Sequence, residues 1–128
     1  MILLDTCVLF WLECNPARIP TAVKDVFQGT DSIVHASAIS AFELGLKIRN
    51  KQLELPLPAS EWVQEVCNRR GIHLLPINTD VAGHSTLLPL SHKDPCDRFL
   101  IATAISSDLT MVTPDTTIHQ YPNLKVLW

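Results

Sequence analysis

The chain begins with a short apolar run that ends on a carboxylate, and a second run of the same kind lies near its end. The first run, residues 1–4, leads into Asp5, and the second, residues 109–112, leads through Thr113 and Pro114 into Asp115. Short apolar runs bounded by turn residues are typical of strands in a parallel sheet, because helices cover both faces of such a sheet. Reactive groups in open α/β sheets collect beyond the carboxyl ends of the strands. We therefore expect two aspartates from opposite ends of the sequence to meet at one edge of a sheet.

Helical stretches alternate with the strand candidates along the whole chain. Further strands are predicted at residues 33–35, 72–75 and 124–127. Helices are predicted to begin after Asp5, at Pro20, near Ser37, at a capping Ser60, at Asn78 or Thr79, and at Asp94. The helix over 94–107 has almost no polar face, which predicts that it is buried on most sides. The alternation predicts an α/β fold, a three-layer α/β/α sandwich around a mainly parallel sheet.

Composition narrows the class of protein. The 128 residues predict a single domain over 1–128, and a hydrophobic share of 47% predicts a well-filled core. The net charge of −3 argues against a broad basic face that holds nucleic acid by neutralising phosphates alone. Four scattered cysteines without a C-x-x-C pair indicate reduced thiols, and no leader or membrane-spanning stretch is evident. We expect a soluble, cytoplasmic protein.

Four acidic residues lie where a strand ends or a helix begins, and each has an ordinary explanation. Asp5 can cap the following helix, and Glu43 fits a Ser-x-x-Glu capping box over residues 40–43. Asp97 lies in the first turn of a helix that Asp94 caps, and Asp115 can belong to a turn. Taken one at a time, these explanations are adequate.

Together, the four acids point to a metal site, because parallel α/β topology brings such positions to one edge. Phe42 and Leu46 bracket Glu43, which predicts that the Glu43 side chain lies near the core-facing side of its helix. Converging carboxylates repel one another unless divalent cations compensate their charge. Oxygen-only ligand sets suit Mg²⁺ or Mn²⁺, and such ions support hydrolysis of a phosphodiester.

These motifs, in this order, resemble the PIN-domain family and, within it, the VapC-like toxin branch. The resemblance rests on Leu3-Leu4-Asp5-Thr6, Ser40-Ala41-Phe42-Glu43, His92-Lys93-Asp94-Pro95-Cys96-Asp97-Arg98, Leu100-Ile101-Ala102, Val112-Thr113-Pro114-Asp115 and the closing residues 124–128. The Asp-Pro-x-Asp-Arg block with its apolar helix is the most specific of these. Cys96 stands where the family more often has an aromatic or aliphatic residue.

The resemblance implies a function and a set of site residues. The acidic quartet of the family falls on Asp5, Glu43, Asp97 and Asp115, with Asp5 and Asp97 as direct metal ligands and Asp94 as a possible auxiliary acid. It implies a Mg²⁺-dependent endoribonuclease, with Mn²⁺ as a substitute, acting as the toxin of a toxin–antitoxin pair. RNA as substrate, a cognate antitoxin protein that covers the acidic groove, and a homodimer are implied by the family as well.

Other interpretations remain open. The main rival is a catalytically silent PIN-like module that only binds RNA or protein, although no member of the quartet is missing. A cysteine hydrolase built on His92 and Cys96 is disfavoured, because Pro95 disrupts the helical spacing and no orienting residue is evident. Arg98 can contact phosphate or pair with an acid. The basic residues Lys47, Arg49 and Lys51 can guide an RNA backbone, but a solvated helix end is the commoner explanation. Trp11, Trp62 and Trp128 are expected in the core or in a dimer contact.

Overall fold

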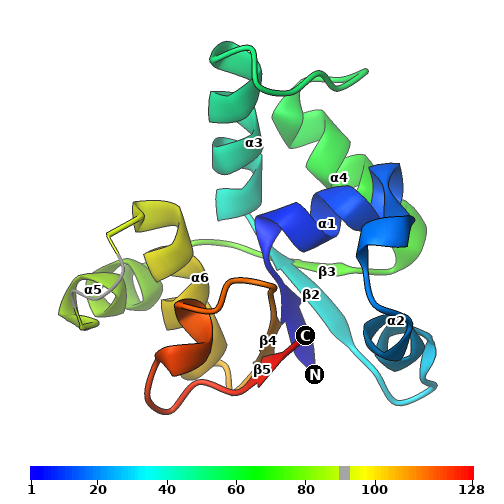
Figure 1. Ribbon diagram of the computed structural model, residues 1–128. Helices are drawn as coiled ribbons and strands as arrows, with labels where there is room; N and C mark the ends of the chain where they lie inside the picture. Colours follow the sequence, from blue (N-terminus) through cyan, green and yellow to red (C-terminus); the bar gives the residue numbers. More distant parts are fainter. Residues whose placement is uncertain (90–92) are drawn as a thin grey trace.

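A sheet of five parallel strands forms the centre of the protein, as seen in a computed structural model that describes residues 1–89 and 93–128 (Figure 1). The strand order is β3-β2-β1-β4-β5. The strands are β1 (Ile2–Leu4), β2 (Val34–Ser37), β3 (His73–Leu75), β4 (Thr110–Val112) and β5 (Val126–Leu127). The predicted parallel sheet is confirmed, with the opening strand at its centre.

Both faces of the central strand β1 are buried, which explains why this strand is apolar without alternation. Leu3 aligns with His35 of β2 on one side and Met111 of β4 on the other. Ile2 and Leu4 point into one hydrophobic cluster and Leu3 into another, and none of the three is more than 5% exposed. A strand between two helical layers needs an apolar residue at every position.

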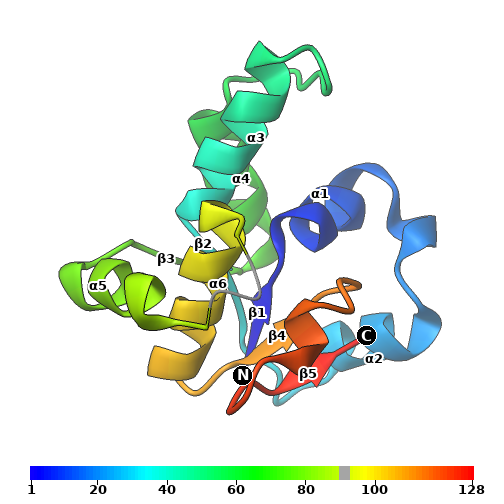
Figure 2. The ribbon, with the colours of Figure 1, turned by 60° about the vertical axis from the view of Figure 1, so that its left-hand side comes forward.

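Six α-helices of the described chain surround the sheet (Figures 1 and 2). They are α1 (Thr6–Cys14), α2 (Thr21–Gln28), α3 (Ile39–Arg49), α4 (Ala59–Arg70), α5 (Thr79–Leu87) and α6 (Pro95–Ser106). Residues of α1, α2 and α4 fill the first cluster, and residues of α5 and α6 fill the second. Helix α3 rises beyond the carboxyl ends of the strands (Figure 1). The three-layer sandwich is confirmed.

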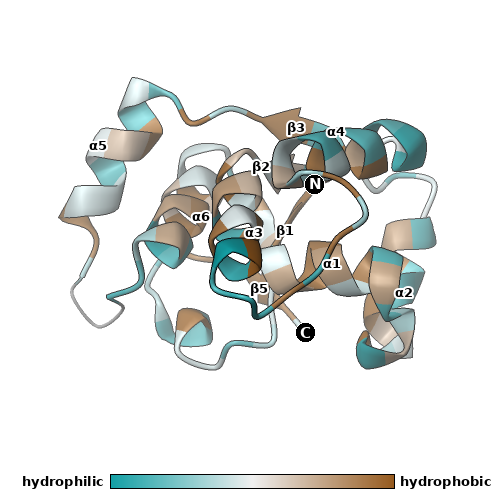
Figure 3. Cartoon of the chain, turned by 90° about the horizontal axis from the view of Figure 1, so that it is seen from above, coloured by the Kyte–Doolittle hydropathy of each residue, from teal (hydrophilic) through white to brown (hydrophobic). Residues whose placement is uncertain are grey.

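Helix α6 is the buried helix that the sequence predicts. Asp94 is its N-cap and accepts a hydrogen bond from the Cys96 amide at 2.9 Å, and Pro95 is its first residue. Leu100 and Ile101 are fully buried. Seen from above, hydrophobic residues run along α6 while the outer turns of α2 and α4 are hydrophilic (Figure 3). Within the described residues, no helix is both long and apolar enough to cross a bilayer.

Three local predictions are wrong. Helix α4 begins at Ala59 with Pro58 as N-cap, so Ser60 is not the cap; the Pro58 ring fixes φ, and the helix starts two residues earlier than a Ser60 cap would start it. Strand β2 begins at Val34, and the preceding Ile33 is 44% exposed. Phe42 and Leu46 of α3 are exposed, because α3 packs through Ile39 and Leu44 instead.

Candidate functional site

Three carboxylates meet at the carboxyl edge of the sheet. Asp5, Glu43 and Asp97 each place one carboxylate oxygen so that all three oxygens lie within 4.8 Å of one another. Asp5 follows the central strand β1, Glu43 belongs to α3 and Asp97 to the first turn of α6. Helix α3 begins at this edge, directly after β2. Helix α6 also begins at this edge, and its C-terminal end leads into β4. These three residues, of which the first and last are 92 positions apart in the sequence, converge as the topology requires, and we call them the acidic trio.

Asp5 is held tightly by its neighbours. Its side chain is buried, with 7% exposed, and accepts hydrogen bonds from the Thr6 amide at 2.7 Å and the Thr113 hydroxyl at 2.6 Å. Its own amide donates to the Val112 carbonyl at 3.0 Å. Burial raises the pKa of Asp5 to about 6; the charges of Asp97 and Asp115 add to the rise, and the two hydrogen bonds oppose it.

Glu43 is the member of the trio that lacks a full set of partners. One of its oxygens, Oε1, is buried and has no hydrogen-bond partner in the described part of the chain. Burial raises the pKa of this carboxyl, the Thr6 hydroxyl lowers it, and the charge of Asp5 raises it further. The predicted capping box is wrong: Ser40 lies inside α3, and its hydroxyl shares a 2.8 Å hydrogen bond with the Thr6 hydroxyl.

The start of α6 is anchored to the chain that precedes it. Arg98 donates hydrogen bonds to the Leu88 carbonyl at 2.9 Å and the Pro89 carbonyl at 3.0 Å. The Tyr121 hydroxyl also donates to the Pro89 carbonyl, at 2.9 Å. Arg98 therefore fixes the approach to the helix that carries Asp97, a role that the sequence left open. Asp94 caps the helix and raises the pKa of Glu43 by its charge, but it lies outside the acidic trio.

Asp115 lies beside the trio rather than in it. Its carboxylate accepts hydrogen bonds from the Thr117 amide at 2.9 Å and the Thr117 hydroxyl at 2.6 Å. This is the turn geometry that short aspartate side chains favour. Its charge still raises the pKa of Asp5. The structure thus brings together three of the four predicted acids and leaves Asp115 at the periphery.

A divalent cation fits the acidic trio. Three carboxylates in this arrangement supply only oxygen ligands, the set that hard cations such as Mg²⁺ and Mn²⁺ prefer. The buried Glu43 Oε1 without a partner and the raised pKa of Asp5 are both costs of folding this site without a counter-charge. A cation among the three carboxylates would remove both costs.

Two hydroxyl residues contribute more than the sequence suggested. Thr113 is fully buried and joins the two strand-end aspartates, because its hydroxyl donates to Asp5 and accepts from the Asp115 amide at 3.1 Å. Ser40, also fully buried, helps to orient Thr6. The sequence signal for Thr113 and Ser40 was the same, because each is a small polar residue inside an otherwise apolar segment.

The cysteine-hydrolase alternative gains no support. His92 lies outside the described residues. Burial raises the pKa of the Cys96 thiol to about 12, with the charge of Glu43 adding to the effect. A thiol with such a pKa stays protonated at neutral pH and is a poor nucleophile. All four cysteines are free thiols.

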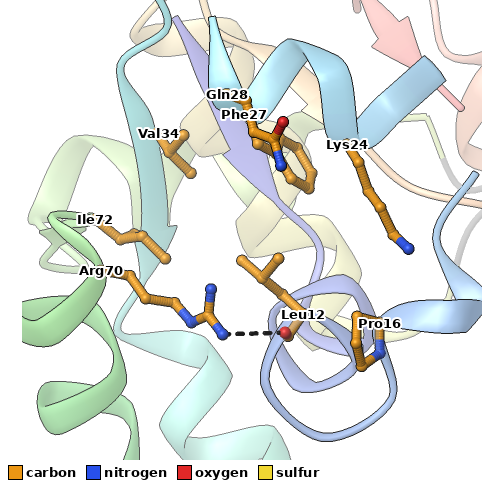
Figure 4. A pocket seen from close by; sticks show the side chains of 8 residues that line it. All are labelled: Leu12, Pro16, Lys24, Phe27, Gln28, Val34, Arg70 and Ile72. Atoms are coloured by element: carbon orange, nitrogen blue, oxygen red, sulfur yellow. Dashed lines mark hydrogen bonds between the residues drawn. The ribbon is translucent and has the colours of Figure 1, made fainter. Parts of the chain in front are cut away.

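A hollow of about 360 Å³ lies away from the acids, between the ends of α1 and α2 and the strand β2 (Figure 4). Its lining residues are Leu12, Pro16, Lys24, Phe27, Gln28, Val34, Arg70 and Ile72. Arg70 donates a hydrogen bond to the Leu12 carbonyl at 3.2 Å, as the dashed line in Figure 4 marks. No carboxylate lines this hollow, so it is separate from the acidic trio.

The raised pKa of Asp5 predicts how pH and metal act on stability. Without metal, the folded protein retains a proton that the unfolded chain has released, so stability falls as pH rises from about 4 to about 6. We expect millimolar Mg²⁺ to raise the melting temperature clearly near pH 7.5 and little near pH 5, where protons compete. Differential scanning fluorimetry with EDTA as reference measures this. An equal or larger effect near pH 5 would contradict a carboxylate site.

Comparisons with known proteins place the chain in a family. Residues 2–124 match the model of the PIN domain. The chain is 31% identical to ribonuclease VapC22 of Mycobacterium tuberculosis (strain ATCC 25618 / H37Rv), an alignment that covers 99% of this chain and 98% of that protein. Its fold is similar to a chain in the DNA-bound VapBC of Salmonella typhimurium, with a TM-score of 0.70, 22% identity and coverage of 99% and 98%. The fold is also similar to that of a chain in VapBC2 of Rickettsia felis bound to a promoter DNA fragment, with a TM-score of 0.68 and 15% identity. This alignment covers 99% of our chain and 98% of that chain.

Proposed function

The chain belongs to the PIN domain family, and on this premise we propose that it is a metal-dependent endoribonuclease, the toxin of a toxin–antitoxin pair. The observation that carries the proposal is the acidic trio, with three carboxylate oxygens within 4.8 Å of one another at the sheet edge. A divalent cation balances the charge of such a cluster, and hydrolysis of RNA phosphodiesters is a reaction that acidic metal sites support. The 31% identity to a ribonuclease over the whole chain supports the same activity.

We assign the residues as follows. Asp5 and Asp97 ligate Mg²⁺, for which Mn²⁺ can substitute, and Glu43 completes the site through its unpartnered Oε1. Asp115 contributes negative charge from the periphery, and Thr113 positions Asp5 by the hydrogen bond at 2.6 Å. When bound, the cation would activate water and stabilise the charge on the leaving oxygen of the phosphodiester. Residues 1–128 would form a single nuclease domain.

Partners follow from the relatives. The fold neighbours described above are VapBC complexes, which supports a protein antitoxin as partner of this chain. RNA is the proposed substrate, and a homodimer is the proposed assembly. Four free cysteines suit a reducing compartment such as the cytoplasm, where we place the protein.

Cleavage of a mixed RNA pool by the purified chain, free of antitoxin, tests the activity. We expect cutting with Mg²⁺ or Mn²⁺, none with EDTA, and a loss of at least about 100-fold in Asp97→Asn, because one charged ligand is gone. Asp80→Asn is the matched control, since Asp80 is an exposed acid in the first turn of α5. It should cleave as the wild type does.

The outcomes separate the interpretations. Cutting that survives Asp97→Asn would contradict the proposed site. A folded protein that binds metal and RNA without cutting any member of the pool would favour the catalytically silent module.

A further inference from the structure

A second hollow adjoins the acidic trio between α1 and α3. It has a volume of about 240 Å³ and begins at Thr6, the residue that follows Asp5. Its lining residues are Thr6, Cys7, Phe10, Trp11, Arg18, Leu44, Lys47, Gln52 and Leu53. The Thr6 hydroxyl forms a hydrogen bond with the Ser40 hydroxyl and lowers the pKa of Glu43. Thr6 therefore lies between the hollow and the acidic trio. We call it the α1–α3 hollow.

One side of the α1–α3 hollow carries a stacked cation. The Arg18 guanidinium carbon lies 4.1 Å above the centre of the Trp11 ring, and Trp128 contacts that ring with centroids 5.9 Å apart. Trp11 is half-buried and Arg18 is exposed. Arg18 forms no ion pair within residues 1–89 and 93–128. The indole holds the guanidinium as a flat, charged surface, and nucleobases stack on such planes.

The other side carries Lys47 and Gln52. Lys47 lies one helical turn after Glu43 and lines the hollow, and its charge lowers the pKa of both Glu43 and the Cys7 thiol. It has no ion-pair partner at salt-bridge distance among the residues described. The Gln52 amide offers both donors and an acceptor to a ligand. A solvated helix end does not explain a half-buried lysine in this place.

The residues that line the α1–α3 hollow indicate the kind of ligand that it binds. The hollow has two cationic side chains without ion pairs among the described residues, Arg18 and Lys47, although the net charge of the chain is −3. These cations suit an anionic ligand, and they offset its repulsion by the neighbouring carboxylates. The apolar floor of Phe10, Leu44 and Leu53 suits a planar ring, and 240 Å³ is below the 300–1,000 Å³ typical of drug-sized pockets. A single nucleotide combines these properties: a phosphate, a flat base and hydrogen-bonding edges.

We propose that the α1–α3 hollow binds one nucleotide of the RNA, a neighbour of the nucleotide whose phosphate lies at the acidic trio. The base stacks on Arg18, Gln52 contacts the base edge, and Lys47 holds the phosphate. This inference rests on the proposed ribonuclease function and adds the part of the site that selects the sequence to be cut.

Binding measured without cleavage tests the inference separately from the activity. The background is Asp97→Asn with Mg²⁺ present, and the probe is a fluorescein-labelled pool of short single-stranded RNA followed by anisotropy. We expect Arg18→Ala and Lys47→Ala each to weaken binding about 5- to 50-fold. Arg18→Lys should not restore it, because an ammonium lacks the planar surface. Arg49→Ala, an exposed cation on the same helix outside the hollow, should weaken it at most about twofold.

Sequencing of cleaved ends adds a readout of specificity in the active protein. Gln52→Ala should change the base preferred at one position next to the cut and leave the number of cuts per molecule similar. Binding losses for Arg18→Ala and Lys47→Ala no larger than for Arg49→Ala would overturn the inference, whether or not the wild type cleaves. That result would be expected if the hollow served an antitoxin side chain instead. Absence of cleavage by the wild type, with the binding losses intact, would instead overturn the proposed activity alone.

Discussion

Asp5→Asn should abolish metal-dependent RNA cleavage and, at the same time, make the metal-free protein more stable near pH 7.5. A direct metal ligand contributes several kcal/mol to the transition state, so we expect a rate loss of at least about 1,000-fold. Asparagine keeps an oxygen that can accept the hydrogen bond from the Thr6 amide, so the helix cap survives. The substitution therefore removes the charge of Asp5 and the hydrogen bond that the Thr113 hydroxyl donates to Oδ2, because an NH₂ group takes the place of that oxygen. Losing this hydrogen bond costs about 1 kcal/mol, less than the penalty of the buried charge.

The gain in stability follows from the pKa of Asp5. Burial raises this pKa from 3.8 to about 6, so near neutral pH the folded state holds a charge that it disfavours by on the order of 2–3 kcal/mol. Asparagine carries no charge, and the penalty disappears; near pH 4 the wild type is itself protonated and the difference should vanish. Urea unfolding in EDTA at both pH values measures the free energy of unfolding.

Asp80→Asn is again the control, because Asp80 is an exposed acid in the first turn of α5, away from the acidic trio. Mg²⁺ should stabilise this control as it stabilises the wild type, and it should leave Asp5→Asn unchanged. Loss of stability in Asp5→Asn near pH 7.5 would show that Asp5 is a structural acid whose charge the fold needs.

Leu100→Ala should destabilise the protein by about 3–4 kcal/mol. Leu100 lies in the middle of α6, is fully buried and belongs to the cluster between α6 and the sheet. Removing its branched end loses the transfer free energy and leaves a cavity that the packed neighbours Leu3 and Met111 cannot fill. For a domain with a free energy of unfolding of about 5–15 kcal/mol, this loss is between about one fifth and four fifths of the total. Urea unfolding measures the change.

Leu87→Ala provides the matched control, because Leu87 is the same residue type at 80% exposure, at the end of α5. We expect a change within about 0.5 kcal/mol. Similar losses for both variants would mean that α6 is not the buried helix described above.

The order of elements and the identity of the acids could be predicted from local rules. Asp94 and Pro95 start a helix by capping and by a fixed φ, and the helix they start is too apolar to lie at the surface. Asp5 and Asp97 lie at strand and helix ends that parallel topology brings to one edge. Such rules depend on neighbours in sequence, which is why they succeed here.

The rotation of α3 could not be predicted in this way. Apolar residues lie on more than one face of this helix, so its periodicity permits several orientations. Packing decides the orientation, because Leu44 enters the cluster shared with α1 and α4. Gly45 faces Ala59 of α4, and a Cβ added to it would make an ordinary van der Waals contact at 3.7 Å. Phe42 is consequently exposed while Glu43 turns toward Asp5, for a reason other than the flanking apolar residues.

The sequence by itself thus determined the parallel sheet, the buried helix α6 and the acids available to a metal site. The tertiary structure alone decided that Asp115 turns toward Thr117 rather than joining the trio, that Ser40 meets Thr6, and that Arg18 lies on Trp11. Each of these contacts joins side chains whose directions depend on the packing of whole elements. Local sequence patterns fix where an element begins and which period it follows, but the free energy that fixes its rotation comes from distant residues.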